Sequence, residues 1–269
     1  MIELNENDLK NFAGHSSKGN QLKWCQDNIW YKADYTGYEG LSEYMISNLI
    51  SKSNLEPSEY ILYETEGISY KHTSFKGAKS KDFLTEGDQL ITLSRLYNNK
   101  YNRDFTKDLW HINETTNRLE FLIDQVVQMT GLEDFGIYMT KMLTIDAFFL
   151  NEDRHLHNIA VIMKPDNTFK YCPFFDQGAG LLADTTLDYP MGVDIYNLIG
   201  EVKGKTICQD LNEALDVAES LYGQTIHFTF NKSDVSNLLS DESVYDSEIK
   251  KRVETIIYEQ MRKYTYLFN

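Results

Sequence analysis

Cysteine is scarce in this sequence, and the few that are present are not arranged for cross-linking. Only three of the 269 residues are cysteines, Cys25, Cys172 and Cys208, and they lie far apart with no C-x-x-C spacing. Such a set indicates neither a disulfide framework nor a zinc ribbon. We therefore expect a protein of the reducing cytoplasm.

Long apolar runs are also missing. No run approaches the ~18–20 residues that span a bilayer, so no membrane span is expected. The first residues, "MIELNENDLKNF", are acidic and lack the basic-then-apolar order of a signal peptide. A hydrophobic content of 42% with 25% charged residues is typical of a globular protein with a sizeable core.

Positive charge is in short supply, since the net charge is −15 and the sequence pI is about 4.8. Direct binding to nucleic acid needs a basic surface, so this class of function is disfavoured. A nucleotide remains an acceptable ligand, because a few well-placed cations and Mg²⁺ can neutralise its phosphates locally.

The order of patterns along the chain predicts two lobes. Residues 1–76 read as strands around one amphipathic helix, "GLSEYMISNLISKSN", with turns expected at Asp27–Asn28 and at Glu66–Gly67. The polar segment 77–88 resembles a linker. Residues 89–269 are mainly helical, and a strongly apolar helix, "FGIYMTKMLTIDAFFL", leads into a polar motif.

That motif places oxygen ligands at both ends of an expected hairpin. Asp153 and Asn158 are spaced D-x-x-x-x-N, and the strands "IAVIM" and "TFKYCPFF" then lead to Asp176 and Gly178 in D-x-G spacing. Because a hairpin brings its ends together, Asp153 and Asn158 should face Asp176. Two carboxylates and an amide oxygen suit Mg²⁺. This is the layout of the catalytic Asp and the two metal-binding residues of protein kinases.

The same stretch invites a different hypothesis, a transition-metal site. His155 and His157 form H-x-H beside Asp153. Such sites usually need three or four ligands, and the other histidines are scattered without ligand spacing. We therefore expect His155 to bond the loop backbone and His157 to be a surface or packing residue.

The N-terminal part supplies candidates for the nucleotide phosphates. Lys32 closes an aromatic strand, where a kinase keeps its phosphate-contacting lysine. Glu43 in the following helix could orient Lys32 through an ion pair, and Glu39 competes for that role. The preceding loop "GHSSKGN" is neither a kinase glycine loop nor a P-loop, but it can present N–H groups and hydroxyls to phosphates. Its candidate residues are Gly14, Ser16, Ser17 and Gly19.

Two segments together resemble the HipA-like kinases, bacterial serine/threonine kinases distantly related in fold to phosphoinositide kinases. "LNEDRHLHN" is similar to the family loop G-N-x-D-R-H-x-x-N, with Asn151-Glu152 in place of Gly-Asn, and "CPFFDQG" is similar to P-x-[YF]-D. The resemblance implies that Asp153 is the catalytic base, that Asn158 and Asp176 bind Mg²⁺, and that Lys32 binds ATP. Arg154 and His155 complete the loop as structural or phosphate-facing residues.

The resemblance also implies a fold class and an activity. We expect an α+β, two-lobed protein-kinase-like fold that transfers the γ-phosphoryl of ATP, with Mg²⁺, to a serine or threonine of a protein substrate. It further implies autophosphorylation in the Gly/Ser loop, an antitoxin partner protein, and secretion as an effector as an alternative to the cytoplasm. A lipid or small-molecule kinase on the same fold, and a non-catalytic binding module, remain the alternative functions.

Overall fold

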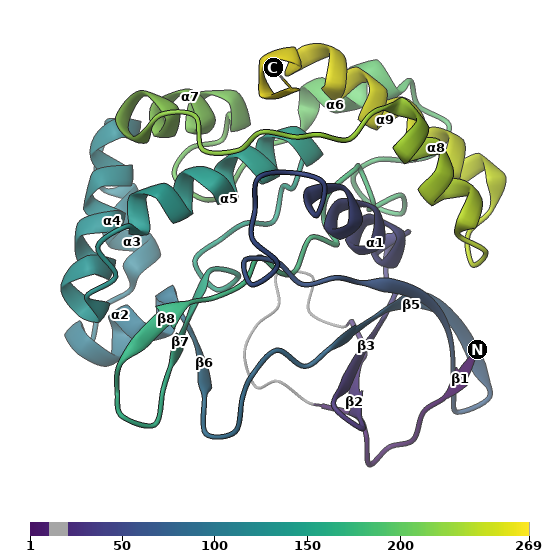
Figure 1. Cartoon of the computed structure of the whole chain (residues 1–269), viewed down its shortest axis with the longest axis horizontal. Coiled ribbons are helices and arrows are strands. Elements are labelled where there is room, and N and C mark those ends of the chain that lie inside the picture. Colours follow the sequence, from purple (N-terminus) through teal and green to yellow (C-terminus); the bar gives the residue numbers. More distant parts are fainter. Residues whose placement is uncertain (11–20, 269) are drawn as a thin grey trace.

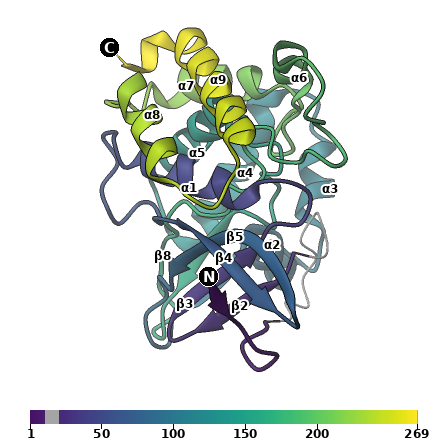
Figure 2. The same ribbon diagram turned by 90° about the vertical axis from the view of Figure 1, so that its right-hand side faces the viewer.

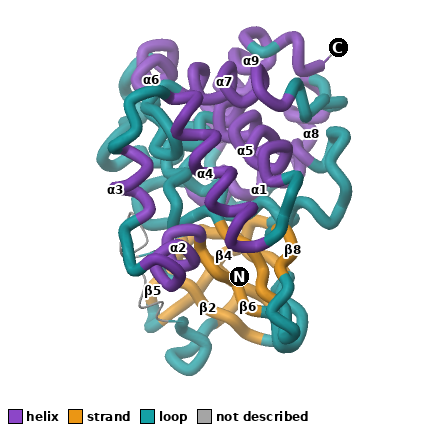
Figure 3. Tube along the Cα trace, turned by 90° about the vertical axis from the view of Figure 1, so that its left-hand side faces the viewer, coloured by secondary structure: helices purple, strands orange, loops and turns teal. Residues whose placement is uncertain are grey.

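The computed structural model describes residues 1–10 and 21–268 (Figure 1). The candidate loop residues Gly14, Ser16, Ser17 and Gly19 lie outside the described residues. Figure 3 shows strands gathered at one end of the molecule and most helices at the other. The expected α+β, two-lobed architecture is therefore confirmed.

A five-stranded sheet with the order β1-β4-β5-β3-β2 forms the first lobe, together with one helix. Only β1 and β4 pair in parallel; the other neighbours are antiparallel. The elements are β1 (Ile2–Glu3), β2 (Lys23–Gln26), β3 (Ile29–Ala33), α1 (Glu39–Ile50), β4 (Glu64–Tyr70) and β5 (Thr73–Lys81).

The second lobe carries a small antiparallel sheet, β6-β7-β8, beneath a layer of helices (Figure 2). Its strands are β6 (Gln89–Thr92), β7 (Ala160–Met163) and β8 (Phe169–Tyr171). Its helices are α2 (Leu93–Tyr101), α3 (Phe105–Trp110), α4 (Thr115–Thr130), α5 (Phe135–Phe149), α6 (Ile195–Glu201), α7 (Leu211–Tyr222), α8 (Lys232–Asp241) and α9 (Ser247–Lys263), followed by a 3₁₀ turn at Thr265–Phe268. None of the helices in the described part of the chain is long and apolar enough to cross a bilayer.

The β2–β3 hairpin turns where the sequence predicts it. Asp27 and Asn28 have φ angles of 51° and 60°, the left-handed conformation that a tight two-residue hairpin turn requires. This turn fixes the register so that Lys32 on β3 lies opposite Lys23 on β2. Two lysines therefore stand side by side on the strands nearest the cleft.

The other expected turn, at Glu66–Gly67, was wrong. β4 runs through both residues, and the chain reverses instead at Lys71 and His72, which have φ angles of 49° and 64°. Glycine is a usual turn signal, but Gly67 pairs with Lys76 inside the β4–β5 ladder. Lysine is not a usual turn residue and histidine is a weaker turn signal than glycine, so the local pattern pointed to the wrong residues.

The segment expected as a linker, 77–88, begins as a strand. Its first residues, to Lys81, belong to β5, which pairs with β3 on one side and β4 on the other. Gly77 and Ala78 are buried among polar neighbours, and small residues there allow close backbone approach. Residues 82–88 connect the two sheets, and the division into lobes at this point stays a prediction.

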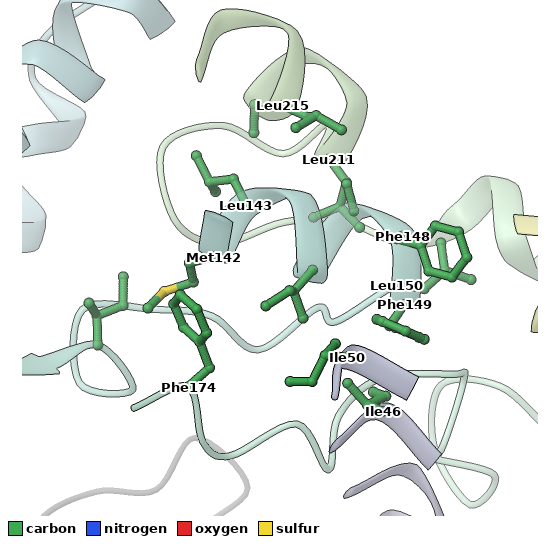
Figure 4. Packing of buried hydrophobic residues seen from close by; sticks show 14 of the residues in the cluster. Ile46, Ile50, Met142, Leu143, Phe148, Phe149, Leu150, Phe174, Leu211 and Leu215 are labelled. Atoms are coloured by element: carbon green, nitrogen blue, oxygen red, sulfur yellow. The ribbon is translucent and has the colours of Figure 1, made fainter. Parts of the chain in front are cut away.

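Helix α1 is fixed to the helical lobe as well as to the sheet. Ile46 and Ile50 point into the large hydrophobic core and lie near Phe149 and Phe174 (Figure 4). The five-stranded sheet has a separate, smaller hydrophobic cluster around Trp24. Because α1 contributes to the core of the second lobe, the position of any side chain on its inner face is fixed relative to residues 151–158, the expected catalytic loop.

Candidate active site

A cleft between the lobes brings the predicted residues together. The β7–β8 hairpin places Asp153 and Asn158 at its entry near Asp176 at its exit, and the first lobe covers them. The cleft has an empty volume of about 620 Å³, including its open mouth. Its lining includes Lys23, Glu39, Glu43, Asp153, Asn158 and Asp176.

Lys32 joins two carboxylates at the back of this cleft. Its Nζ lies 2.7 Å from Oε1 of Glu43 and 2.8 Å from Oδ1 of Asp176. Burial alone would lower the pKa of Lys32, but Asp176 and Glu43 raise it well above its ordinary value. The ammonium group is therefore charged at neutral pH and couples α1 to the D-x-G segment.

Glu43 rather than Glu39 pairs with Lys32. The carboxylate of Glu39 instead accepts hydrogen bonds from the backbone N–H groups of Thr36 and Gly37, at 2.7 and 3.1 Å. Thr36 and Gly37 precede Tyr38, the N-cap residue of α1, so these hydrogen bonds hold the turn that leads into the helix, and the negative charge of Glu39 also suits the helix N-terminus. Glu39 thus fixes the start of α1, and Glu43 faces Lys32 one turn later.

Asp176 has an unusual backbone conformation and a perturbed carboxyl group. Its φ angle of 61° is uncommon for a residue other than glycine, and such strain concentrates at functional sites. Burial would raise the pKa of Asp176, but the nearby cations Lys32, Lys23 and Arg154 hold it well below its usual range. The carboxylate is thus ionised and ready to bind a cation.

The donor set fits Mg²⁺. Asn158 donates from Nδ2 to the carbonyl oxygen of Asp153 at 2.9 Å, which directs Oδ1 to serve as the ligand atom. Mg²⁺ in nucleotide sites is usually held by one or two protein oxygens, with phosphates and water completing its coordination. Asn158 and Asp176 supply such oxygens at the cleft.

The two histidines are not arranged as a transition-metal site. His155 accepts a hydrogen bond at Nδ1 from the backbone N–H of His157, and His157 contacts Ser94 on the exposed side. Burial lowers the pKa of His155, which keeps its ring neutral at neutral pH. Within residues 1–10 and 21–268, no group of three His, Cys, Asp or Glu side chains converges to hold a metal ion.

Arg154 points into the protein interior and holds the catalytic loop. Its guanidinium forms two-pronged contacts with Asp146 of α5, with Nε 3.0 Å from Oδ2 and Nη2 3.1 Å from Oδ1. Nη2 also donates to Oε1 of Gln177 at 2.9 Å, and Nη1 donates to the carbonyl oxygen of Phe175. One buried cation thus ties α5, the catalytic loop and the D-x-G segment together. Of the two expected roles of Arg154, structural or phosphate-facing, its contacts favour the structural one.

Gln177, the middle residue of D-x-G, connects this network to α1. Its backbone N–H donates to Oε2 of Glu43 at 2.9 Å, and its carbonyl oxygen accepts from the hydroxyl of Ser42 at 2.8 Å. Its side-chain Oε1 also accepts from Asn151 at 3.1 Å. Sequence reasoning missed Gln177 because these partners lie 23 or more residues away along the chain; Asp146 lies only 8 residues before Arg154 and was missed because it sits within a strongly apolar helix.

Two further lysines near the cleft were also missed. Lys23 lines the cleft opposite Lys32. Asp176 alone would raise the pKa of Lys23, but burial and the neighbouring Lys32 outweigh it and lower the pKa. Lys205, from the loop after α6, lies with Nζ 3.0 Å from Oδ1 of Asp153. Lys23 begins an aromatic-rich strand, and this pattern could have identified it as a candidate. No local pattern marks Lys205.

Asp34 links the start of α1 to the C-terminal helices and makes stability depend on pH. It accepts hydrogen bonds from the Gly40 N–H at 2.7 Å and from the Tyr245 hydroxyl at 2.8 Å. Burial, with a smaller effect of Glu39, raises the pKa of Asp34 from 3.8 to about 7. Between about pH 4 and pH 7 the folded chain keeps a proton that the unfolded chain has lost, so this group's contribution to stability falls as pH rises.

Replacing Asp34 by an uncharged side chain should remove this pH dependence of stability. We expect the unfolding free energy of Asp34→Asn minus that of wild type to rise by about 1 to 3 kcal/mol from pH 5 to pH 8. Urea unfolding at the two pH values measures the change, with Asp216→Asn on the exposed face of α7 as the control. An equal difference between Asp34→Asn and wild type at both pH values would contradict the assignment.

Comparisons with known proteins agree with this architecture. No protein-family model matches the sequence, and no curated protein matches it significantly. Among solved structures, the proinflammatory kinase CtkA of Helicobacter pylori has a TM-score of 0.64 at 16% identity, over 99% of this chain and 96% of that chain. HipA, in its complex with HipB and operator DNA from a Shewanella oneidensis toxin–antitoxin system, has a TM-score of 0.47 at 14% identity, over 96% of this chain and 63% of that one. The chain therefore has the two-lobed kinase-like fold that its resemblance to the HipA-like kinases predicts.

Proposed function

We propose that the protein is an ATP- and Mg²⁺-dependent serine/threonine protein kinase of HipA-like type. The observation that carries the proposal is the convergence of Asp153, Asn158 and Asp176 in one cleft with the Lys32–Glu43 pair. These five residues come from four separate segments, and each has the chemistry that its kinase role requires. A binding module without catalysis would not need all of them in this arrangement.

The reaction would depend on positioning and charge neutralisation. Asp153 would accept the proton of the substrate hydroxyl, because a catalytic-loop carboxylate in a kinase lies next to the attacking oxygen. Lys32 would orient the nucleotide phosphates while Glu43 holds its ammonium in place. Asn158 and Asp176 would hold Mg²⁺, which would neutralise the phosphates as charge develops.

The class of acceptor is tested by labelling. The protein should be incubated with [γ-³²P]ATP and Mg²⁺ in the presence of the protein fraction, the lipid extract or the small-molecule fraction of a cell lysate. We expect label in serine or threonine of proteins. Label confined to lipid or small molecules would support the alternative kinases, and label in none of the fractions would support a binding module.

Autophosphorylation in the Gly/Ser loop belongs to the same proposal. A phosphate on Ser16 or Ser17 would add about −1.5 to −2 charges and would compete with ATP for the loop. We expect the intact mass of the wild-type protein, expressed in a bacterial host, to exceed its unmodified mass by one phosphate, whereas Asp153→Asn stays unmodified. Equal, unphosphorylated masses for both proteins would reject this part of the proposal.

An antitoxin partner and a cytoplasmic location are predictions from the family resemblance. The net charge of −15 suits a basic partner or basic substrate segment. Copurification of a partner encoded beside this gene would test the first prediction directly.

A further inference from the structure

The loop that follows α6 docks onto the catalytic loop. The hydroxyl of Thr206 is buried and donates to the carbonyl oxygen of Arg154 at 2.5 Å. On the same loop, Gly204 donates its N–H to the carbonyl of Gln209 at 2.8 Å, and Ile207 accepts from Arg118 at 2.9 Å. Residues on both sides of Lys205 are therefore anchored.

This anchoring places the ammonium group of Lys205 against the predicted catalytic base. Nζ of Lys205 lies 3.0 Å from Oδ1 of Asp153, whose side chain is 11% exposed. The side chain of Lys205 is itself 47% exposed, and its ammonium contacts a carboxylate that lines the cleft. A cation thus stands beside the atom that would receive the substrate proton.

Three other basic groups nearby are engaged elsewhere, and Lys23, on β2 opposite Lys32, has its strongest charge interaction with Asp176 rather than with Asp153. Lys32 is held between Glu43 and Asp176. Arg154 is turned into the interior towards Asp146, and His155 is neutral because burial lowers its pKa. Among the lysines and arginines of residues 1–10 and 21–268, Lys205 is the one that forms an ion pair with Asp153, at the attacking end of the reaction where the transferred phosphoryl group would meet the hydroxyl.

We propose that Lys205 is a catalytic residue that contacts the γ-phosphoryl group during transfer; this inference rests on the proposed kinase function. In the step, a bond forms between the substrate hydroxyl oxygen and the γ-phosphorus. The bond from that phosphorus to the β–γ bridging oxygen breaks, and its electron pair leaves with ADP. The hydroxyl proton goes to Asp153, while Lys205 keeps its own protons and donates a hydrogen bond to a γ-phosphoryl oxygen.

Such a contact acts where negative charge spreads over the equatorial oxygens of the phosphoryl group. A preorganised donor at the site of developing charge accelerates reactions by about 10²- to 10³-fold. The β7–β8 hairpin and α6 lie between Asp153 and Lys205 in the sequence, so the cation comes from outside the catalytic loop. We accordingly expect Lys205→Met to lower kcat by about 10²- to 10³-fold.

A comparison of two nucleotides tests whether Lys205 contacts the γ-phosphoryl group or only holds the side chain of Asp153 in place. In calorimetry with Mg²⁺, wild type should bind the non-hydrolysable ATP analogue AMP-PNP more tightly than ADP. Lys205→Met should weaken AMP-PNP binding by about tenfold or more, as expected for a lost charge-assisted hydrogen bond, and leave ADP binding unchanged. Lys205→Arg should restore part of the preference for AMP-PNP.

Lys203, exposed on the same loop, supplies the matched control as Lys203→Met. Equal urea midpoints for all variants would show that they are folded. If Lys205→Met keeps the wild-type preference for AMP-PNP, the proposed contact is wrong, even where kcat has fallen. If wild type binds neither nucleotide, the proposed kinase function fails and this inference with it.

Discussion

Replacing Asp153 by alanine should reduce phosphoryl transfer by about 10²- to 10⁴-fold, the range for loss of a general base. Asp153 lies in the cleft beside Asn158 and Lys205, where it can accept the hydroxyl proton of the acceptor. Initial rates of ³²P incorporation at saturating ATP measure the effect. Affinity for Mg²⁺–ADP should change little, because the residues assigned to the metal and to the phosphates remain.

The fold should survive this change. The carboxylate of Asp153 contacts the polar side chains of Asn158 and Lys205 and is not part of the apolar core of the second lobe. Asp124→Ala, on the exposed face of α4, is the control for loss of a carboxylate elsewhere. A turnover of Asp153→Ala near that of the control would show that the assigned base is wrong.

Replacing Arg154 by methionine should lower the unfolding free energy by about 3 to 5 kcal/mol. The side chains of Arg154 and Asp146 are only 2% and 1% exposed. Removal of one partner of a buried ion pair leaves an uncompensated charge in the interior, which costs this much in other proteins. Urea unfolding followed by circular dichroism measures the loss.

Two variants sharpen this test. Arg262→Met removes an arginine that is 77% exposed and pairs with Glu259 on the surface of α9, so it should cost less than about 1 kcal/mol. The double change Asp146→Leu with Arg154→Met should recover much of the loss, because it removes both buried charges. A cost for Arg154→Met no greater than that for Arg262→Met would contradict the structural role of Arg154.

Local patterns predicted much of this molecule. Periodicity indicated the longer helices α1, α4, α5, α7 and α9, strand patterns indicated the β7–β8 hairpin, and Asp27–Asn28 marked a true turn. The nominated side chains Lys32, Glu43, Asp153, Asn158 and Asp176 lie together because a hairpin and a helix bring them there. Short spacing nominated Asp153, Asn158 and Asp176, whereas Lys32 and Glu43 were nominated from the order of elements in kinases.

The errors and omissions have a different origin. The turn at Lys71–His72 contains none of the Gly, Pro, Asn, Asp or Ser residues that usually mark a turn, so it gave no strong local signal. The contacts of Gln177 with Glu43 and of Lys205 with Asp153 join residues separated by long stretches of chain. Such pairs follow from the tertiary fold, and one sequence carries no local pattern for them.

The central claim is that Asp176 and its neighbours form a magnesium-dependent phosphoryl-transfer site. Its most direct test is transfer of ³²P from [γ-³²P]ATP to protein by the purified chain, with and without Mg²⁺, beside the variant Asp176→Ala. We expect Mg²⁺-dependent label in serine or threonine with wild type and none above background with a folded Asp176→Ala. Equal labelling by the two proteins, or no transfer by wild type to any acceptor, would contradict the claim.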